Sequence, residues 1–181
     1  MSVLRKILLL VIIVMALLIV GGFFLPSEYS MQRSTVINAP IDRVYNLVAD
    51  LSRNETWSPW KAKDPTVEIT LGEQTSGPGA SYTWVSENSG KGRLTITELI
   101  PNYSIKTSLD FMDQGTQAEG LWQFEPSPEG IHVTWMMKGD VGRNIVGRYF
   151  GLVMDMMAGR DFEMGLANLK EIAEKQSPGT E

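Results

Sequence analysis

The sequence contains no cysteine, which excludes disulfides, thiolate metal sites and cysteine nucleophiles. It has a single histidine, His132, so a multi-histidine metal site is excluded and a Ser-His-Asp arrangement would depend on that residue. Acidic residues outnumber basic ones, with 21 Asp and Glu and 16 Lys and Arg, and neither sign forms a long run. Nucleic-acid binding usually needs a clustered basic face, so the composition disfavours that class.

The familiar catalytic patterns are missing as well. No nucleophile–base pair, acidic dyad or metal-ligand spacing is present in the sequence. Gly77-Pro78-Gly79 lacks the strand–helix context that a nucleotide-binding loop needs. We therefore expect no catalytic constellation, no metal and no cofactor.

One long apolar run stands near the N-terminus, at residues 7–25, and carries no charge. As a helix it would be about 28 Å long, close to a hydrocarbon thickness of about 30 Å. A cleaved signal peptide is the alternative, but its apolar region is usually about 7–15 residues and ends in small residues. Bulky residues stand at that place here, so we expect residues 1–28 to be an uncleaved membrane anchor.

The charges flanking this run predict its orientation. Arg5 and Lys6 precede it, whereas Ser27, Glu28 and Tyr29 follow it. The positive-inside rule then places the N-terminus in the cytoplasm and the rest of this single-pass protein in the periplasm or outside the cell.

Residues 29–176 are expected to form one domain, followed by a disordered tail at residues 177–181. Residues 29–37 read as a strand, and Pro40 suits the first position of the helix that follows. That helix has one apolar stripe and ends near Asp50, with another helical turn at residues 51–57. The stripe consists of Ile41, Val44, Tyr45 and Val48.

The middle of the chain alternates apolar and polar residues between turn signals, which predicts an antiparallel meander with one buried face and one wet face. His132 has the opposite parity to its apolar neighbours and is expected to face solvent. The predicted inward residues are Val67, Ile69, Leu71, Tyr82, Trp84, Leu94, Ile96, Tyr103, Ile105, Thr107, Leu109, Phe111, Ala118, Gly120, Trp122, Phe124, Ile131, Val133, Trp135 and Met137.

Residues 141–176 change to a helical period. A helix of about 30 residues would be about 45 Å long, whereas a compact domain of this size is about 40 Å across, from a radius of gyration of about 15 Å. We therefore expect a broken, bent or overhanging helix, with Gly147 and Gly151 as weak points. The element order predicts an α+β fold with the helices on one face of the sheet. Large and small inward residues allow either a tight fit or a cavity.

Three segments resemble one known group of proteins. They are Ser34-Thr35-Val36-Ile37-Asn38-Ala39-Pro40 with Val44-Tyr45, Trp57-Ser58-Pro59-Trp60 with Asp64-Pro65, and Met154-Asp155 with Gly159-Arg160-Asp161-Phe162-Glu163, Gly165-Leu166 and Leu169-Lys170. Together they resemble the polyketide cyclase/START-like (SRPBCC) superfamily, in its membrane-anchored bacterial subset, over about residues 29–175. The resemblance implies a helix-grip fold, in which about seven antiparallel strands curl round the last helix. It also implies an internal cavity for apolar or amphipathic molecules, because members include lipid carriers, plant hormone and allergen-type binders, and aromatic cyclases.

Trp57 and Trp60 bracket Ser58-Pro59 in an otherwise polar run. Spaced three apart on a helical turn, both rings can point the same way. They can plug one end of the core, form the wall or lid of a cavity, or serve carbohydrate stacking or partner docking.

The candidate ligand-binding residues are mostly aromatic and inward: Trp57, Trp60, Tyr82, Trp84, Tyr103, Trp122, Trp135, Met157 and Phe162. Plain core packing is the competing interpretation for each. Convergent polar groups could come from Tyr103, Arg93 and Asp161. For Asp155 and Arg160-Asp161, ion pairing or helix capping is favoured over catalysis.

These observations support three hypotheses. The leading one is a membrane-anchored, non-enzymatic domain that binds a hydrophobic or amphipathic small molecule such as a lipid in an internal cavity. The second is a cyclase- or dehydratase-type enzyme that orients a reactive chain with a Tyr or Arg. The third is an envelope protein-interaction module with a filled core.

Overall fold

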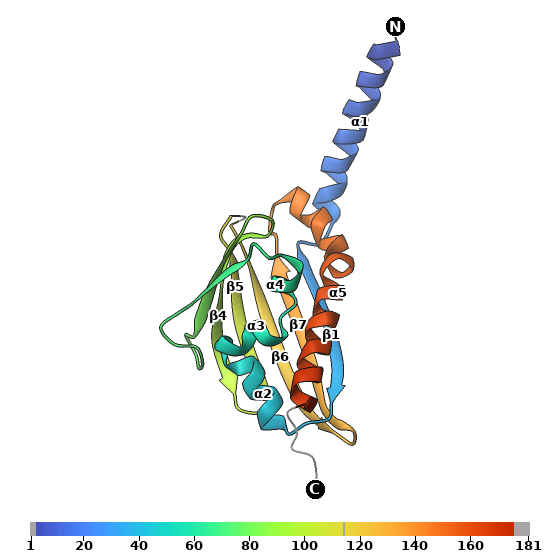
Figure 1. Ribbon diagram of the computed structural model, residues 1–181. Coiled ribbons are helices and arrows are strands. Elements are labelled where there is room, and N and C mark those ends of the chain that lie inside the picture. Colours follow the sequence, from blue (N-terminus) through green and yellow to red (C-terminus); the bar gives the residue numbers. More distant parts are fainter. Residues whose placement is uncertain (1–2, 114, 176–181) are drawn as a thin grey trace.

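The computed structural model describes residues 3–113 and 115–175, so the tail predicted for residues 177–181 lies outside the described residues. Helix α1 (Val3–Phe24) projects away from the rest of the chain (Figure 1). Almost all its side chains are exposed, and only Gly22 is buried. Within the described residues, α1 is the one helix long and apolar enough to cross a membrane.

The seven strands form one antiparallel sheet in the order β1-β7-β6-β5-β4-β3-β2, so β1 and β2 are its edges. Six strands make the predicted meander, while β1 joins the far edge by pairing with β7. The strands are β1 (Glu28–Ile37), β2 (Glu68–Leu71), β3 (Ser81–Ser86), β4 (Gly90–Ile100), β5 (Ser104–Phe111), β6 (Thr116–Ser127) and β7 (Gly130–Asp140). The predicted α+β, helix-grip architecture is confirmed.

The helices cover one face of this sheet (Figure 1). They are α2 (Ile41–Ala49), a 3-10 turn (Leu51–Arg53), α3 (Asn54–Trp57), α4 (Trp60–Lys63) and α5 (Ile145–Lys175). Pro40 is the residue just before α2 rather than its first helical residue, which corrects the prediction by one position. Its fixed φ suits either position, and the amide nitrogens of Arg43 and Val44 donate to its carbonyl oxygen.

Helix α5 runs without a break over 31 residues, including Gly147 and Gly151. The expected excess length appears as an overhang, because its first turns lie beside the base of α1 at one end of the sheet (Figure 1). The glycines are tolerated because the helix is held by packing against β1 and the other helices, and packing outweighs local propensity.

The inward face follows the predicted alternation, except that Leu71 on the edge strand β2 is 42% exposed and that Tyr103 needs a correction. That residue lies in the turn before β5, with 51% of its surface exposed, rather than on the inward face of the strand. Its amide nitrogen donates to the carbonyl oxygen of Ile100, which closes the turn. A register shift between Ile96 and Glu98 changes the pairing of β4 with β5 just before this turn.

Candidate functional site

Four of the predicted aromatic residues form one packed cluster between the sheet and α5. The rings of Trp122 and Trp135 stack with centroids 4.4 Å apart, and Trp135 stacks on Phe162 at 3.9 Å. Trp57 meets Trp122 and Trp135 edge-on at 5.4 and 5.8 Å. The indole nitrogen of Trp57 donates to the carbonyl oxygen of Leu47 at 2.9 Å, so its polar atom is satisfied. This part of the inward face is a close fit.

A glycine on α5 explains how close this fit is. A Cβ at Gly165 would lie 3.0 Å from a ring carbon of Trp135 and 3.3 Å from Cδ of Pro59. The aromatic cluster is therefore wedged between β6, β7 and α5. The sequence left open whether large and small residues meant a tight fit or a cavity, and around Trp135 the fit is tight.

The remainder of the inward face is different. A set of apolar side chains there lies on the helix side of the sheet yet stays only half-buried. We call this set the open apolar face: Trp60, Trp84, Leu94, Leu109 and Phe111. Because the strand residues of this set share the inward parity of fully buried residues, their exposure means that the helices cover only part of the sheet.

The strand register brings this face together. Leu94 of β4 lies opposite Leu109 of β5, and Gly92 lies opposite Phe111. Trp84 of β3 lies opposite Gly92, and its ring meets Phe111 edge-on at 5.7 Å. Sequence reasoning predicted these faces of the strands, but it did not assign Leu94, Leu109 or Phe111 to the site. Gly92 was the available signal, since a glycine inside a strand often marks a close approach.

Polar groups near this face are few. Tyr82 is buried beside Trp84, with ring centroids 6.3 Å apart, and burial raises the pKa of its phenol well above the usual value. The phenol therefore stays protonated at neutral pH and can donate a hydrogen bond but not act as a base. Arg93 and His132 have the outward parity, opposite Asp110 and Glu125 respectively. The chain's one histidine is thus on the other face of the sheet.

Two further candidates are exposed. Tyr103 lies in its turn, and Met157 of α5 has 57% of its surface exposed. Neither belongs to the apolar clusters that line the inward face. The third polar candidate, Asp161, is buried and pairs with Nζ of Lys63 at 2.5 Å. This pair fastens α4, which carries Trp60, to α5.

An ion cluster closes the edge of the sheet next to α5. Arg33 has inward parity on β1, opposite Trp135, and its guanidinium contacts Asp155 and Glu163 at 2.7 Å each. Hydrogen bonds from Arg33 lower the pKa of Asp155. A Cβ at Gly159 would lie 2.1 Å from Nη2 of Arg33, so the guanidinium crosses α5 at the glycine. Ion pairing of Asp155, favoured from the sequence, is confirmed.

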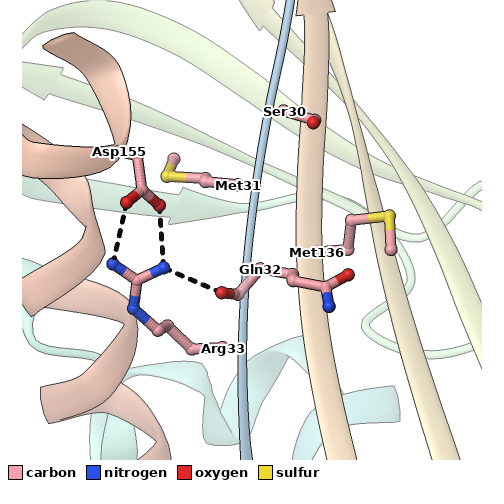
Figure 2. Close-up of a pocket in the computed structure, with 6 residues that line it drawn as sticks. All are labelled: Ser30, Met31, Gln32, Arg33, Met136 and Asp155. Atoms are coloured by element: carbon pink, nitrogen blue, oxygen red, sulfur yellow. Dashed lines mark hydrogen bonds and ion pairs between the residues drawn. The ribbon is translucent and has the colours of Figure 1, made fainter.

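A surface pocket of about 310 Å³ opens beside this cluster (Figure 2). Arg33 also donates to the carbonyl oxygen of Gln32 at 2.8 Å. The guanidinium of Arg33 is therefore already bonded to protein acceptors. It has a structural role, and we assign no ligand to this pocket. The lining residues are Ser30, Met31, Gln32, Arg33, Met136 and Asp155.

A buried carboxylate fixes the segment after α4. Asp64 accepts hydrogen bonds from the hydroxyls of Ser86 and Thr66 and from the side-chain amide of Asn88. These bonds, with Ser86 the largest cause, hold the pKa of Asp64 far below its usual range. Asp64 thereby ties the chain beyond Trp60 to the end of β3. The Asp64-Pro65 motif was its one sign in the sequence.

The fold and the inward apolar surface define a helix-grip protein of the cyclase-like or ligand-binding class. The family model described as "Polyketide cyclase / dehydrase and lipid transport" matches residues 29–174, and the chain belongs to this family. The expected superfamily is confirmed. No curated protein sequence matches the chain.

Solved structures with low sequence identity share the fold. A protein of unknown function from Staphylococcus aureus is 13% identical with a TM-score of 0.63, covering 83% of this chain and 96% of that one. A protein from Chromobacterium violaceum is 19% identical with a TM-score of 0.55, covering 81% and 97%. The di-domain ARO/CYC protein StfQ from the steffimycin biosynthetic pathway is 13% identical with a TM-score of 0.61, covering 83% of this chain and 52% of that one.

Proposed function

We propose that the protein is a membrane-anchored binding domain that holds a hydrophobic or amphipathic small molecule, such as a lipid, against the open apolar face. The observation that carries the proposal is the half-exposure of inward aromatic and aliphatic side chains at Trp84, Leu94, Leu109 and Phe111. Removing apolar surface from water stabilises by about 25 cal/mol per Å², and small-molecule sites are mostly apolar with few polar groups. The family description, which includes lipid transport, supports the same class of ligand.

The proposal includes the location of the domain. Helix α1 crosses the bilayer with Arg5 and Lys6 on the cytoplasmic side, which puts the binding domain in the periplasm or outside the cell. A tether of this kind would keep the open apolar face close to a source of lipid.

Tryptophan quenching in the full chain tests ligand binding. All five tryptophans, Trp57, Trp60, Trp84, Trp122 and Trp135, lie in the aromatic cluster or the open apolar face, so a bromine-bearing ligand there must quench emission. The protein is placed in bilayers of unbrominated lipid and titrated with a brominated medium-chain fatty acid. We expect saturable quenching.

A matched pair of variants locates the binding. Leu109→Gln puts a polar group in the open apolar face and should weaken binding by about tenfold, since each 1.4 kcal/mol is a factor of ten. Val85→Gln changes an exposed residue on the outward parity of β3 and should leave binding unchanged. Equal effects of the two changes, or no saturable quenching, would overturn the proposal. The second result would favour an envelope protein-interaction module.

The family description and StfQ favour a cyclase-type enzyme as the second candidate. Because the single histidine, His132, lies on the outward face, acid–base chemistry on the inward face would depend on a group such as the protonated Tyr82. Turnover of a reactive polyketide-like chain, lost in Tyr82→Phe while the variant keeps its tryptophan emission, would support the enzyme. Binding that survives Tyr82→Phe without any turnover supports the carrier.

A further inference from the structure

The first turns of α5, residues 145–157, present an outward surface that carries no charge. Its exposed apolar residues include some of the most accessible in the molecule outside α1, with 68% of Val146 and 73% of Met156 accessible. The others on this surface are Phe150, Leu152 and Met157. A continuous exposed apolar patch of this kind marks a contact with another apolar phase.

The two charged residues of this segment are turned toward protein groups. Arg148 donates to the carbonyl oxygens of Phe23 and Leu25 at the end of α1, each at 3.0 Å, and to that of Gly142. Asp155 pairs with Arg33. The next charged residue on the outward side is Arg160, so the uncharged surface ends where the helix runs down along the sheet.

The same segment is in contact with α1. The hydroxyl of Tyr149 donates to the carbonyl oxygen of Leu18 at 2.8 Å. A Cβ at Gly22 would lie 2.3 Å from Cγ2 of Ile145, so the two helices touch at a glycine. Leu18 stands six residues before the end of α1 at Phe24, which is about 9 Å along the helix axis.

These contacts set the depth of α5 relative to the membrane. The 22 residues of α1 make a helix about 33 Å long, little more than a hydrocarbon core of about 30 Å. Leu18 then lies about 7 Å below the outer edge of that core, so the side chain of Tyr149 extends from the bilayer surface into the acyl chains. Tyrosine is enriched near this interface, because its ring is apolar and its hydroxyl polar.

We propose that the outward surface of residues 145–157 lies in the surface of the bilayer that α1 crosses, with Val146, Phe150 and Leu152 among the lipids. This inference rests on the proposed membrane span of α1 and is independent of ligand binding. On the side of α5 that faces the domain, Met154 and Ala158 pack against the cluster that includes Phe111 and Phe162. One helix, about 10 Å thick, then separates the lipid from the open apolar face.

Single labels test this placement in the full chain, which has no native cysteine to interfere. An environment-sensitive fluorophore is attached at Phe150→Cys, Leu152→Cys, Met15→Cys or Ala167→Cys, all at exposed positions. The proteins are placed in phosphatidylcholine vesicles containing lipid with a nitroxide near the top of the acyl chain, or near its end for position 15, which lies near the middle of α1. We expect quenching at positions 150 and 152, as at position 15 of α1, and none at position 167 of the same helix α5.

Each other outcome overturns a distinct claim. Quenching at position 15 with positions 150 and 152 as unaffected as position 167 would sink the placement of α5 and leave the anchor intact. No quenching at position 15 would sink the membrane span itself. Labels at position 150 that escape the nitroxide but quench one another between copies would show that a second chain, not lipid, covers this surface.

Discussion

The indole of Trp84 occupies the space directly beside Gly92 on the neighbouring strand. A Cβ at Gly92 would lie 2.1 Å from Cζ2 of Trp84 and 2.6 Å from the carbonyl oxygen of Asp110. The ring could swing away, but the backbone oxygen belongs to the paired strand β5 and cannot. This glycine therefore sets the position of an aromatic residue in the open apolar face.

We expect Gly92→Ala to destabilise the protein by about 1–3 kcal/mol, the usual cost of overpacking a tight site. It should also shift Trp84 and weaken fatty-acid binding. Urea unfolding in detergent, followed by tryptophan emission, measures the stability change. Gly151→Ala is the matched control, because its Cβ would meet Tyr29 at an ordinary 3.4 Å, and it should gain about 1 kcal/mol of helix propensity. A Gly92→Ala variant as stable as the native chain would contradict the close contact between Gly92 and Trp84.

Asp64 predicts a pH dependence of stability. Its hydrogen bonds, from Ser86 first, lower its pKa in the folded state, whereas an unfolded aspartate titrates at about 3.9. The stabilisation is therefore complete above about pH 4 and is lost as pH falls below that value. We expect Asp64→Asn to be less stable than the native chain at pH 7, with the difference shrinking below pH 4. Unfolding curves between pH 2.5 and 7 check this, and a difference that grows in acid would refute it.

The Lys63–Asp161 pair predicts a non-additive pair of changes. Lys63→Met leaves the buried carboxylate of Asp161 without this cation and should cost about 1–3 kcal/mol. Combining it with Asp161→Asn removes the charge that needs compensation, so the double variant should be more stable than Lys63→Met alone. A double-mutant cycle of urea unfolding measures the coupling. Simple addition of the two single costs would show that the pair does not interact.

The hydrogen bonds of Arg148 predict a rigid joint between α1 and the domain. Its guanidinium caps the carbonyl oxygens of Phe23 and Leu25, which have no partners within α1 itself. We expect Arg148→Ala to broaden the distribution of spin-label distances between Met15→Cys and Ala167→Cys in bilayers. Arg143→Ala changes an exposed arginine in the loop just before α5 and should leave the distance distribution narrow. Equal widths in both variants would argue against the joint.

The alternation along the strands predicted which face each residue of the meander takes, because successive side chains of a strand point to opposite sides. The prediction held for Trp122 and Trp135 and failed at Tyr103, where the strand begins one residue later than the pattern suggests. The uncharged run at residues 7–25 likewise predicted a helix long enough to cross a membrane, and α1 is such a helix. These features are local, and the sequence contains the physical information that decides them.

Trp57 and Trp60 show what remained undecided. They stand three residues apart, yet they belong to separate helices, and Trp57 is 3% exposed while Trp60 is half-buried. The pairing of Arg33 with Asp155 and Glu163 spans more than 120 residues of chain. The hydrophobic pattern determined the strands, the helices and their apolar sides. Which inward side chains are covered was decided by where α4 and α5 lie on the sheet, because exposure depends on contacts between segments that no local pattern encodes.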